Sequence, residues 1–318
     1  MQTGEKEMRR RSRLRRAIAI ALSIVMVAAM IPEFAFAEEV LVTEDNVTEA
    51  DVSEKTETTT TYELSSGENM TVFHSDDVRF KDENGVLTDY DPTLVRIQDE
   101  AGSSVDLSEY AYENREGDSS QYLPESLSEE TPVVMEKDED RVSMSMTEDA
   151  LFSLGITGSV SAEKNLVETA YEEEKEKQVD AVYTGETADI TYRSENKGIK
   201  ETITLYEKPE SGIFTYVLDL EGMIPVIDRT GGISFFDEDD PDEIKGGISP
   251  AFMNDAGGKA YSEDIEYFLE ETEDKGRYLL TMEVSEEYLL DPGRAYPVTI
   301  DPSVSWTGSS KVKDACRI

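Results

Sequence analysis

The sequence predicts a mainly β protein: a β-sandwich of antiparallel sheets, or two small packed β-domains, behind a disordered N-terminal segment. In the stretch 276–302, GRYLLTMEVSEEYLLDPGRAYPVTIDP, apolar and polar residues alternate with a period of two on both sides of a short turn, as in strands with one buried face. Further alternating segments, separated by Asn-Gly, Pro and Gly turn signals, indicate about ten short strands in all. The apolar content of 38% is sufficient for a core.

Residues 1–37 have the pattern of a secretory signal peptide. A cluster of arginines precedes an apolar run over 17–31, and Ala35-Phe36-Ala37 before Glu38 fits a small-x-small cleavage site. An uncleaved membrane anchor is the alternative, although the apolar run is shorter than the roughly 20 residues that a spanning helix needs. The single cysteine, Cys316, is far from the cleavage site, so neither a lipoprotein anchor nor an internal disulfide is expected. The protein is therefore predicted to be secreted.

The net charge of −41 is extreme. A surface this acidic repels the phosphates of nucleic acids and of anionic lipids. We therefore expect no nucleic-acid partner and, after signal cleavage, no membrane partner.

Three composition shifts divide the mature chain. Residues 38–61 are rich in Glu, Asp and Thr and nearly lack aromatic residues, which predicts a disordered acidic linker. A β-rich module is expected over 62–302. Within it, residues 101–138 are dominated by Ser, Glu and Asp and are predicted to be an exposed loop insertion.

The module begins with a predicted hairpin. Short strands over 70–74 and 78–81 are followed by Asp82-Glu83-Asn84-Gly85, whose Asn-Gly pair favours the left-handed conformations of a tight turn, and 86–94 runs back. The segment 141–147 then alternates cleanly, which places Val142, Met144 and Met146 inward as core residues.

The Glu, Lys and Ala content of 161–177 favours a helix, with a solvated linker as the alternative. After it, five further segments are predicted to be strands: 179–183, 189–192, 198–205, 213–220 and 231–236. Residues 264–269 lead into the strand that begins at Tyr278. At the end of the module, Ser285 is the expected cap of a single helical turn between the strands 278–284 and 296–300. Residues 303–318, including Trp306, are predicted to be a truncated tail or the start of a next domain.

Few residues point to chemistry. The acidic run Asp237-Glu238-Asp239-Asp240-Pro241-Asp242-Glu243 is the best cation candidate, but it lacks the Gly and Glu positions of a helix-loop-helix calcium loop, so a solvated loop is favoured. Catalysis of the Ser-His-Asp or Cys-His type would require His74, the single histidine, for which a satisfied or exposed strand position is favoured. No catalytic, cofactor-binding or metal-binding residue is assigned. A carboxylate-dependent hydrolase stays open because 71 acidic residues offer every spacing.

Several segments together resemble the N-terminal module of secreted, wall-associated RHS-repeat and DNRLRE-domain proteins of Gram-positive bacteria. The resemblance rests on KDENG at 81–85, GIKE at 198–201, the ISPAFMNDAGG turn at 248–258 and YPVTIDP at 296–302, and it covers about 62–302. In place of the tryptophan that relatives often have after the first turn, this chain has Leu87.

This resemblance implies a non-catalytic module, without cofactors, at the front of a surface protein. Its implied partners are cell-wall polysaccharide or downstream domains of the same protein, and the chain is then expected to be a truncated fragment. The alternatives are a stand-alone secreted adhesin or glycan-binding module and, less favoured, the carboxylate-dependent hydrolase.

Overall fold

The structure, a computed structural model, describes residues 51–63, 67, 69–82, 84–97, 105–164, 179–258 and 260–307. The chain forms two compact units, one of residues 1–89 with 166–177 and one of residues 90–165 with 178–318. The expected signal peptide, most of the helix expected over 161–177, and Cys316 lie outside the described residues. Within the described part, no helix has the length and apolar character to cross a membrane.

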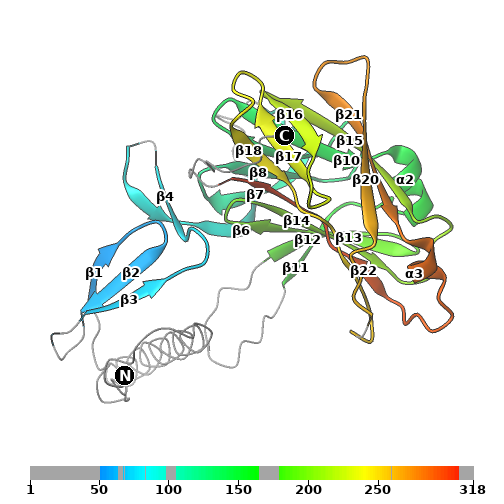
Figure 1. The fold of residues 1–318 in the computed structure, drawn as a ribbon, viewed down its shortest axis with the longest axis horizontal. Coiled ribbons are helices and arrows are strands. Elements are labelled where there is room, and N and C mark those ends of the chain that lie inside the picture. The colour runs from blue at the N-terminus through cyan, green and yellow to red at the C-terminus, as the bar shows by residue number, and fades with distance from the viewer. Residues whose placement is uncertain are drawn as a thin grey trace. The chain divides into compact units, whose positions relative to one another are not determined.

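The first unit contains a three-stranded antiparallel sheet and a hairpin (Figure 1). The sheet consists of β1 (Asp51–Lys55), β2 (Thr59–Glu63) and β3 (Asn69–Phe73), and the hairpin of β4 (Arg79–Lys81) and β5 (Leu87–Asp89). The predicted hairpin is confirmed, with the left-handed conformation at Gly85 and not at Asn84. Gly85 has φ 75°, and the Asp82 carboxylate accepts hydrogen bonds from the backbone N–H groups of Asn84 and Val86 at 2.9 and 2.7 Å.

The prediction of a linker over 38–61 was wrong for its second half, which forms β1 and most of β2. β-Branched threonines favour strands, and Thr60 is buried. Arg79, also buried, donates to the Thr60 hydroxyl at 2.8 Å, to the backbone carbonyls of Thr56 and Thr59 at 3.0 Å each, and to Asp89 at 2.5 Å. This arginine therefore joins β2 to the hairpin through hydrogen bonds.

The second unit contains two antiparallel sheets. The eight-stranded sheet has the order β20-β21-β15-β10-β9-β8-β7-β6. Its strands are β6 (Asp91–Arg96), β7 (Tyr110–Glu116), β8 (Ser120–Pro124), β9 (Val133–Lys137), β10 (Asp140–Met146), β15 (Ile213–Glu221), β20 (Ile265–Glu271) and β21 (Arg277–Val284). Figure 1 shows β10, β15, β21 and β20 side by side.

The ten-stranded sheet has the order β11-β12-β13-β14-β23-β18-β17-β16, with β22 pairing β14 and β19 pairing β22. Its strands are β11 (Ser161–Lys164), β12 (Val179–Thr184), β13 (Ala188–Glu195), β14 (Gly198–Leu205), β16 (Met223–Ile227), β17 (Ile233–Asp237), β18 (Ile244–Ile248), β19 (Met253–Asp255), β22 (Val298–Ile300) and β23 (Ser303–Trp306).

The two sheets of this unit share one continuous apolar core. Inward side chains of the eight-stranded sheet, such as Leu218 and Met282, belong to the same buried cluster as Ile190 and Ile203 of the ten-stranded sheet. The Tyr183 hydroxyl crosses between the sheets and donates to the Pro124 carbonyl at 2.6 Å. The predicted mainly β, sandwich-like fold is confirmed.

The predicted loop insertion over 101–138 was wrong, because β7, β8 and β9 lie in this range. Tyr112 and Leu123 are buried in the core, and Gln121, fully buried, donates its amide to the Glu195 carbonyl at 2.9 Å. In β8 the residues from Gln121 to Pro124 are all buried, so the strand faces protein on both sides and shows no alternation. The acidic residues that suggested a loop lie mostly in the turns and on the outer surface.

Strand β10 confirms the inward positions of Val142, Met144 and Met146, although Ser143 and Ser145 on its other face are buried as well. The short helix α2 (Glu148–Leu154) follows, with Thr147 as its N-cap. The helix predicted from Ser161 begins instead as β11, paired with β12. The rest of that predicted helix lies outside the described residues.

At the C-terminal end, Ser285 caps α3 (Glu286–Leu290) as predicted, accepting from the Tyr288 N–H at 3.4 Å. The module does not end at Pro302, because β23 pairs with β14 on one side and β18 on the other. Trp306, expected outside the folded segment, is only 4% exposed. The Asp-Pro corner at 301–302 suggested a boundary, but it turns the chain from β22 into the next strand of the same sheet.

Candidate functional site

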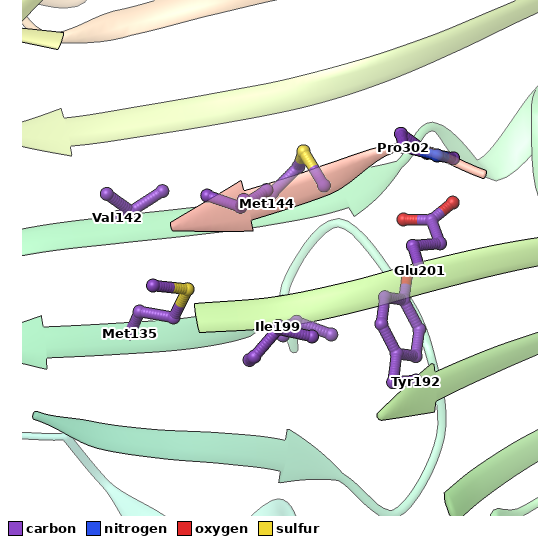
Figure 2. Close-up of a pocket in the computed structure, with 9 residues that line it drawn as sticks. Met135, Val142, Met144, Tyr192, Ile199, Glu201 and Pro302 are labelled. Atoms are coloured by element: carbon purple, nitrogen blue, oxygen red, sulfur yellow. The ribbon is translucent and has the colours of Figure 1, made fainter. Parts of the chain in front are cut away.

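A small cavity lies between the two sheets of the second unit. Its volume is ≈ 20 Å³, and it is lined by Val133, Met135, Val142, Met144, Tyr192, Ile199, Glu201, Pro302 and Val304. Figure 2 shows Glu201 and Tyr192 among these otherwise apolar side chains. A cavity of this size holds about one water molecule. It is far too small for a sugar or a nucleotide.

Glu201 is the unusual residue of this cavity. Strand β14 alternates between inward and outward positions, and Glu201 occupies an inward position between Ile199 and Ile203, where it is 1% exposed. The hydroxyl of Tyr216, on β15 of the opposite sheet, donates to Glu201 Oε1 at 2.8 Å. Glu201 Oε2 has no hydrogen-bond partner among the described residues. The carboxyl group therefore lies in the core and is only partly satisfied.

Burial raises the pKa of Glu201 to about 7, because the charged form loses its hydration. Hydrogen bonds from Tyr216 and Tyr192 lower this pKa in part, and the nearby Asp301 charge raises it further. The same burial, together with the charge of Glu201, holds the pKa values of both tyrosines well above their usual range. At acidic pH, Glu201 is a neutral acid in contact with two neutral phenols.

This arrangement has the raised pKa of a general acid but lacks the open space that a substrate needs. At this position, the chemistry that remains for Glu201 is to gain or lose a proton within the core.

A larger hollow, of ≈ 730 Å³, lies over the ends of β10, β15 and β21. Its three cations are all paired with carboxylates: Arg141 with Glu136 and Glu221, Arg277 with Asp219, and Lys275 with Glu238. Glu129 and Glu130 add further negative charge to its rim. The hollow is a network of surface ion pairs with no excess of positive charge for an anion.

The acidic run from Asp237 to Glu243 forms a surface turn, and backbone N–H groups of this turn donate hydrogen bonds to the Asp237 carboxylate. Asp237 accepts from the backbone N–H groups of Asp239 and Asp240 at 2.8 Å each, and it also pairs with Lys245 at 3.0 Å. Lys245 bonds Asp140 at 2.9 Å as well. Across the described residues, no three His, Cys, Asp or Glu side chains are close enough to hold a metal ion.

The other residues singled out in the sequence do not meet at a site. His74 lies in the first unit, half-buried, with its Nε2 3.4 Å from the Thr60 hydroxyl. Trp306 is a core residue of the second unit. Glu201 was not singled out in the sequence, although an acid at an inward position of an alternating strand is a signal that could have found it.

Comparison with known proteins finds no matching family model and no matching solved structure. It does find curated relatives over part of the chain. The chain is 34% identical over 123 residues to the tRNA(Glu)-specific nuclease WapA of Bacillus subtilis subsp. natto and to the tRNA nuclease WapA of Bacillus subtilis. It is 33% identical over 123 residues to the tRNA3(Ser)-specific nuclease WapA of Bacillus spizizenii. Each match covers 36% of this chain and 5% of the relative.

These relatives correct two expectations. The sequence predicted a protein that is not an enzyme and has no nucleic-acid partner, whereas the matched proteins are named as nucleases of tRNA. The charge argument failed because it describes the average surface of this chain, and the chain spans a small fraction of the length of the relatives. Over about a third of its residues, this chain is similar to tRNA nucleases named WapA.

Proposed function

We propose that this chain is a module of a longer, secreted, wall-associated protein of the RHS-repeat or DNRLRE type, and that the complete protein cleaves tRNA. The similarity to the WapA nucleases supports the reaction. The 5% of their length that the chain matches supports the assignment as a module. The signal-peptide pattern of residues 1–37 supports an extracellular location.

Within such a protein, the sandwich is assigned the role of a folded carrier for the rest of the polypeptide. The observation behind this role is the continuous core shared by the two sheets, in which the cavity beside Glu201 has a volume of only ≈ 20 Å³. A filled interior of this kind gives a rigid and cooperative unit. The acidic surface adds solubility outside the cell.

The experiment compares three forms of the complete gene product in a Gram-positive host: wild type, Trp306→Ala and the matched control Trp306→Phe. The core position of Trp306 makes the alanine variant a test of sandwich integrity. We expect the secreted amount to fall for Trp306→Ala and to stay near wild type for Trp306→Phe. Cleavage of tRNA per molecule of purified protein is expected to be equal in all three.

Two results would contradict the proposal in different ways. If purified wild-type protein leaves total tRNA intact, the assigned reaction is wrong. If Trp306→Ala is secreted normally but cleaves more slowly per molecule, the sandwich takes part in the reaction, and the carrier role is wrong.

Cell fractionation tests the location separately. Protein in the medium or wall fraction that begins at Glu38 is the expected result. Retention in the membrane with residues 1–37 still attached would contradict a secreted, wall-associated protein.

A further inference from the structure

Glu201 connects the two sheets through a polar contact inside an apolar interface. It lies on β14 of the ten-stranded sheet and accepts from Tyr216 on β15 of the eight-stranded sheet at 2.8 Å. Its second oxygen, Oε2, lacks a partner among the described residues and belongs to a carboxyl group that lines the ≈ 20 Å³ cavity. This contact is thus sensitive to whether the carboxyl group carries a proton.

The groups around Glu201 leave its negative charge uncompensated. Tyr192 on β13, Tyr216 on β15 and Tyr267 on β20 are its titratable neighbours, and Asp301, after β22, is a like charge that acts on it. Strands β9, β10 and β23 contribute only Val and Met side chains to the cavity. The adjacent Lys200 pairs with Asp301 at 2.7 Å and so does not neutralise Glu201.

We propose that Glu201 is a pH-dependent lock between the two sheets. The neutral carboxyl group holds the sheets together, and its ionised form loosens their contact. The neutral acid is the form that burial between the sheets favours, and its Oε1 still accepts from Tyr216. No cation of the described residues acts on the carboxylate, and a buried unpaired charge is strongly unfavourable. The cavity beside it gives water a place to enter when the charge forms.

The direction of the effect follows from linkage. The pKa of Glu201 is raised in the folded chain from 4.5 to about 7, so folding favours the protonated form. The stabilisation of the folded chain by protonated Glu201 is complete at pH below 4.5 and is lost progressively as pH rises to about 7. The lock concerns the sandwich alone and does not depend on whether the complete protein cleaves tRNA.

The test measures unfolding of the chain by urea at pH 4 and pH 8 for wild type and Glu201→Gln. Glutamine has the shape of the acid and a donor at the same position but cannot ionise. Because one pKa unit is a tenfold change in an equilibrium constant, we expect the ratio of the unfolding constants, wild type over Glu201→Gln, to rise about 200-fold from pH 4 to pH 8. Equal pH dependence in the two proteins would overturn the proposal.

Glu283→Gln is the matched control, since Glu283 is exposed on β21. Its unfolding is expected to follow wild type at both pH values, which separates the lock from the general effect of one fewer negative charge. If Glu283→Gln reproduces the effect of Glu201→Gln, the lock is refuted.

A direct measurement covers the case in which Glu201→Gln does not fold. In folded wild-type chain labelled with ¹³C at glutamate side chains, one carboxyl signal is expected to titrate near neutral pH. Tyr216→Phe removes a hydrogen bond that lowers this pKa, so the same signal should then titrate at higher pH. The proposal fails if every glutamate signal titrates in the ordinary acidic range, or if Tyr216→Phe leaves the neutral titration unmoved.

Discussion

Replacing Trp306 with alanine tests whether β23 belongs to the folded sandwich. The Trp306 side chain is 4% exposed and lies in the shared core, and its strand pairs with β14 and β18. A buried tryptophan removes about 150–250 Å² from water. At about 25 cal/mol per Å², this corresponds to roughly 4–6 kcal/mol, in line with about 3–5 kcal/mol for measured Trp-to-Ala substitutions in cores.

A loss of about 4 kcal/mol is a large part of the 5–15 kcal/mol that stabilises a typical domain. For a unit of this size, it corresponds to a fall in Tm of roughly 8–16 °C. Circular dichroism during heating and during urea titration measures both quantities. The control, Trp306→Phe, keeps an aromatic ring in the core and should lose less than half as much.

The wild-type chain offers an independent check, because Trp306 is its single tryptophan. Its fluorescence should be that of a buried indole in the native state and shift to longer wavelength in the same urea transition that abolishes the β signal. Two results together would refute the assignment of β23 to the folded sandwich: an unchanged Tm and urea midpoint in Trp306→Ala, and the emission of a solvent-exposed indole from native wild type. The module would then end at Pro302, as the sequence predicted.

Three further substitutions test other contacts, each by urea unfolding against wild type. Gly198→Ala should destabilise the sandwich by about 1–3 kcal/mol, because its Cβ would lie 2.1 Å from the Val304 carbonyl oxygen; an unchanged midpoint would argue against this strand contact. Ser285→Ala should destabilise by about 0.5–1 kcal/mol through loss of the α3 cap, and Ser285→Asp should retain stability; equal losses in both would contradict the capping role. Asp180→Asn should destabilise by about 2 kcal/mol, since the buried Asp180 accepts from Arg193 at 3.0 and 2.7 Å; no change would show that this pair contributes nothing to stability.

Strands with one buried face were predictable from the sequence. In β14 and β21 the inward positions follow a period of two, and the turns beside them contain Gly, Asp or Pro, so type and approximate limits could both be inferred. The single turn capped by Ser285 was also predictable, because the cap uses only local atoms.

Other parts depend on distant partners that the sequence does not reveal locally. Gln121 is buried on β8 because the carbonyl of Glu195, far along the chain, accepts from its amide. The buried Thr60 hydroxyl accepts from Arg79, which is 19 positions further along the chain. The acidic and polar content of both segments suggested solvent exposure, and only the tertiary partners reverse that interpretation.

The same limit applies to Glu201. Its inward position could be predicted from the alternation of β14, but its partner Tyr216 is on the opposite sheet, and its raised pKa depends on burial between the two sheets. The alternation of β14 marks Glu201 as an inward acid among the 71 acidic residues, but the local sequence does not reveal its partner or its raised pKa.

The position of β23 has a consequence for the order in which the sandwich can assemble. In the ten-stranded sheet, β23 lies between β14 and β18 and is the link through which β16, β17 and β18 join the remaining strands. The C-terminal strand of the described chain is therefore a central strand of the sheet. Pairing between segments distant in sequence is slow to form, and here it must await residues 303–306. During synthesis from the N-terminus, the strands β11 to β14 and the strands β16 to β18 would form two sheet fragments with unpaired edges until β23 is made, so completion of the sheet awaits residues 303–306.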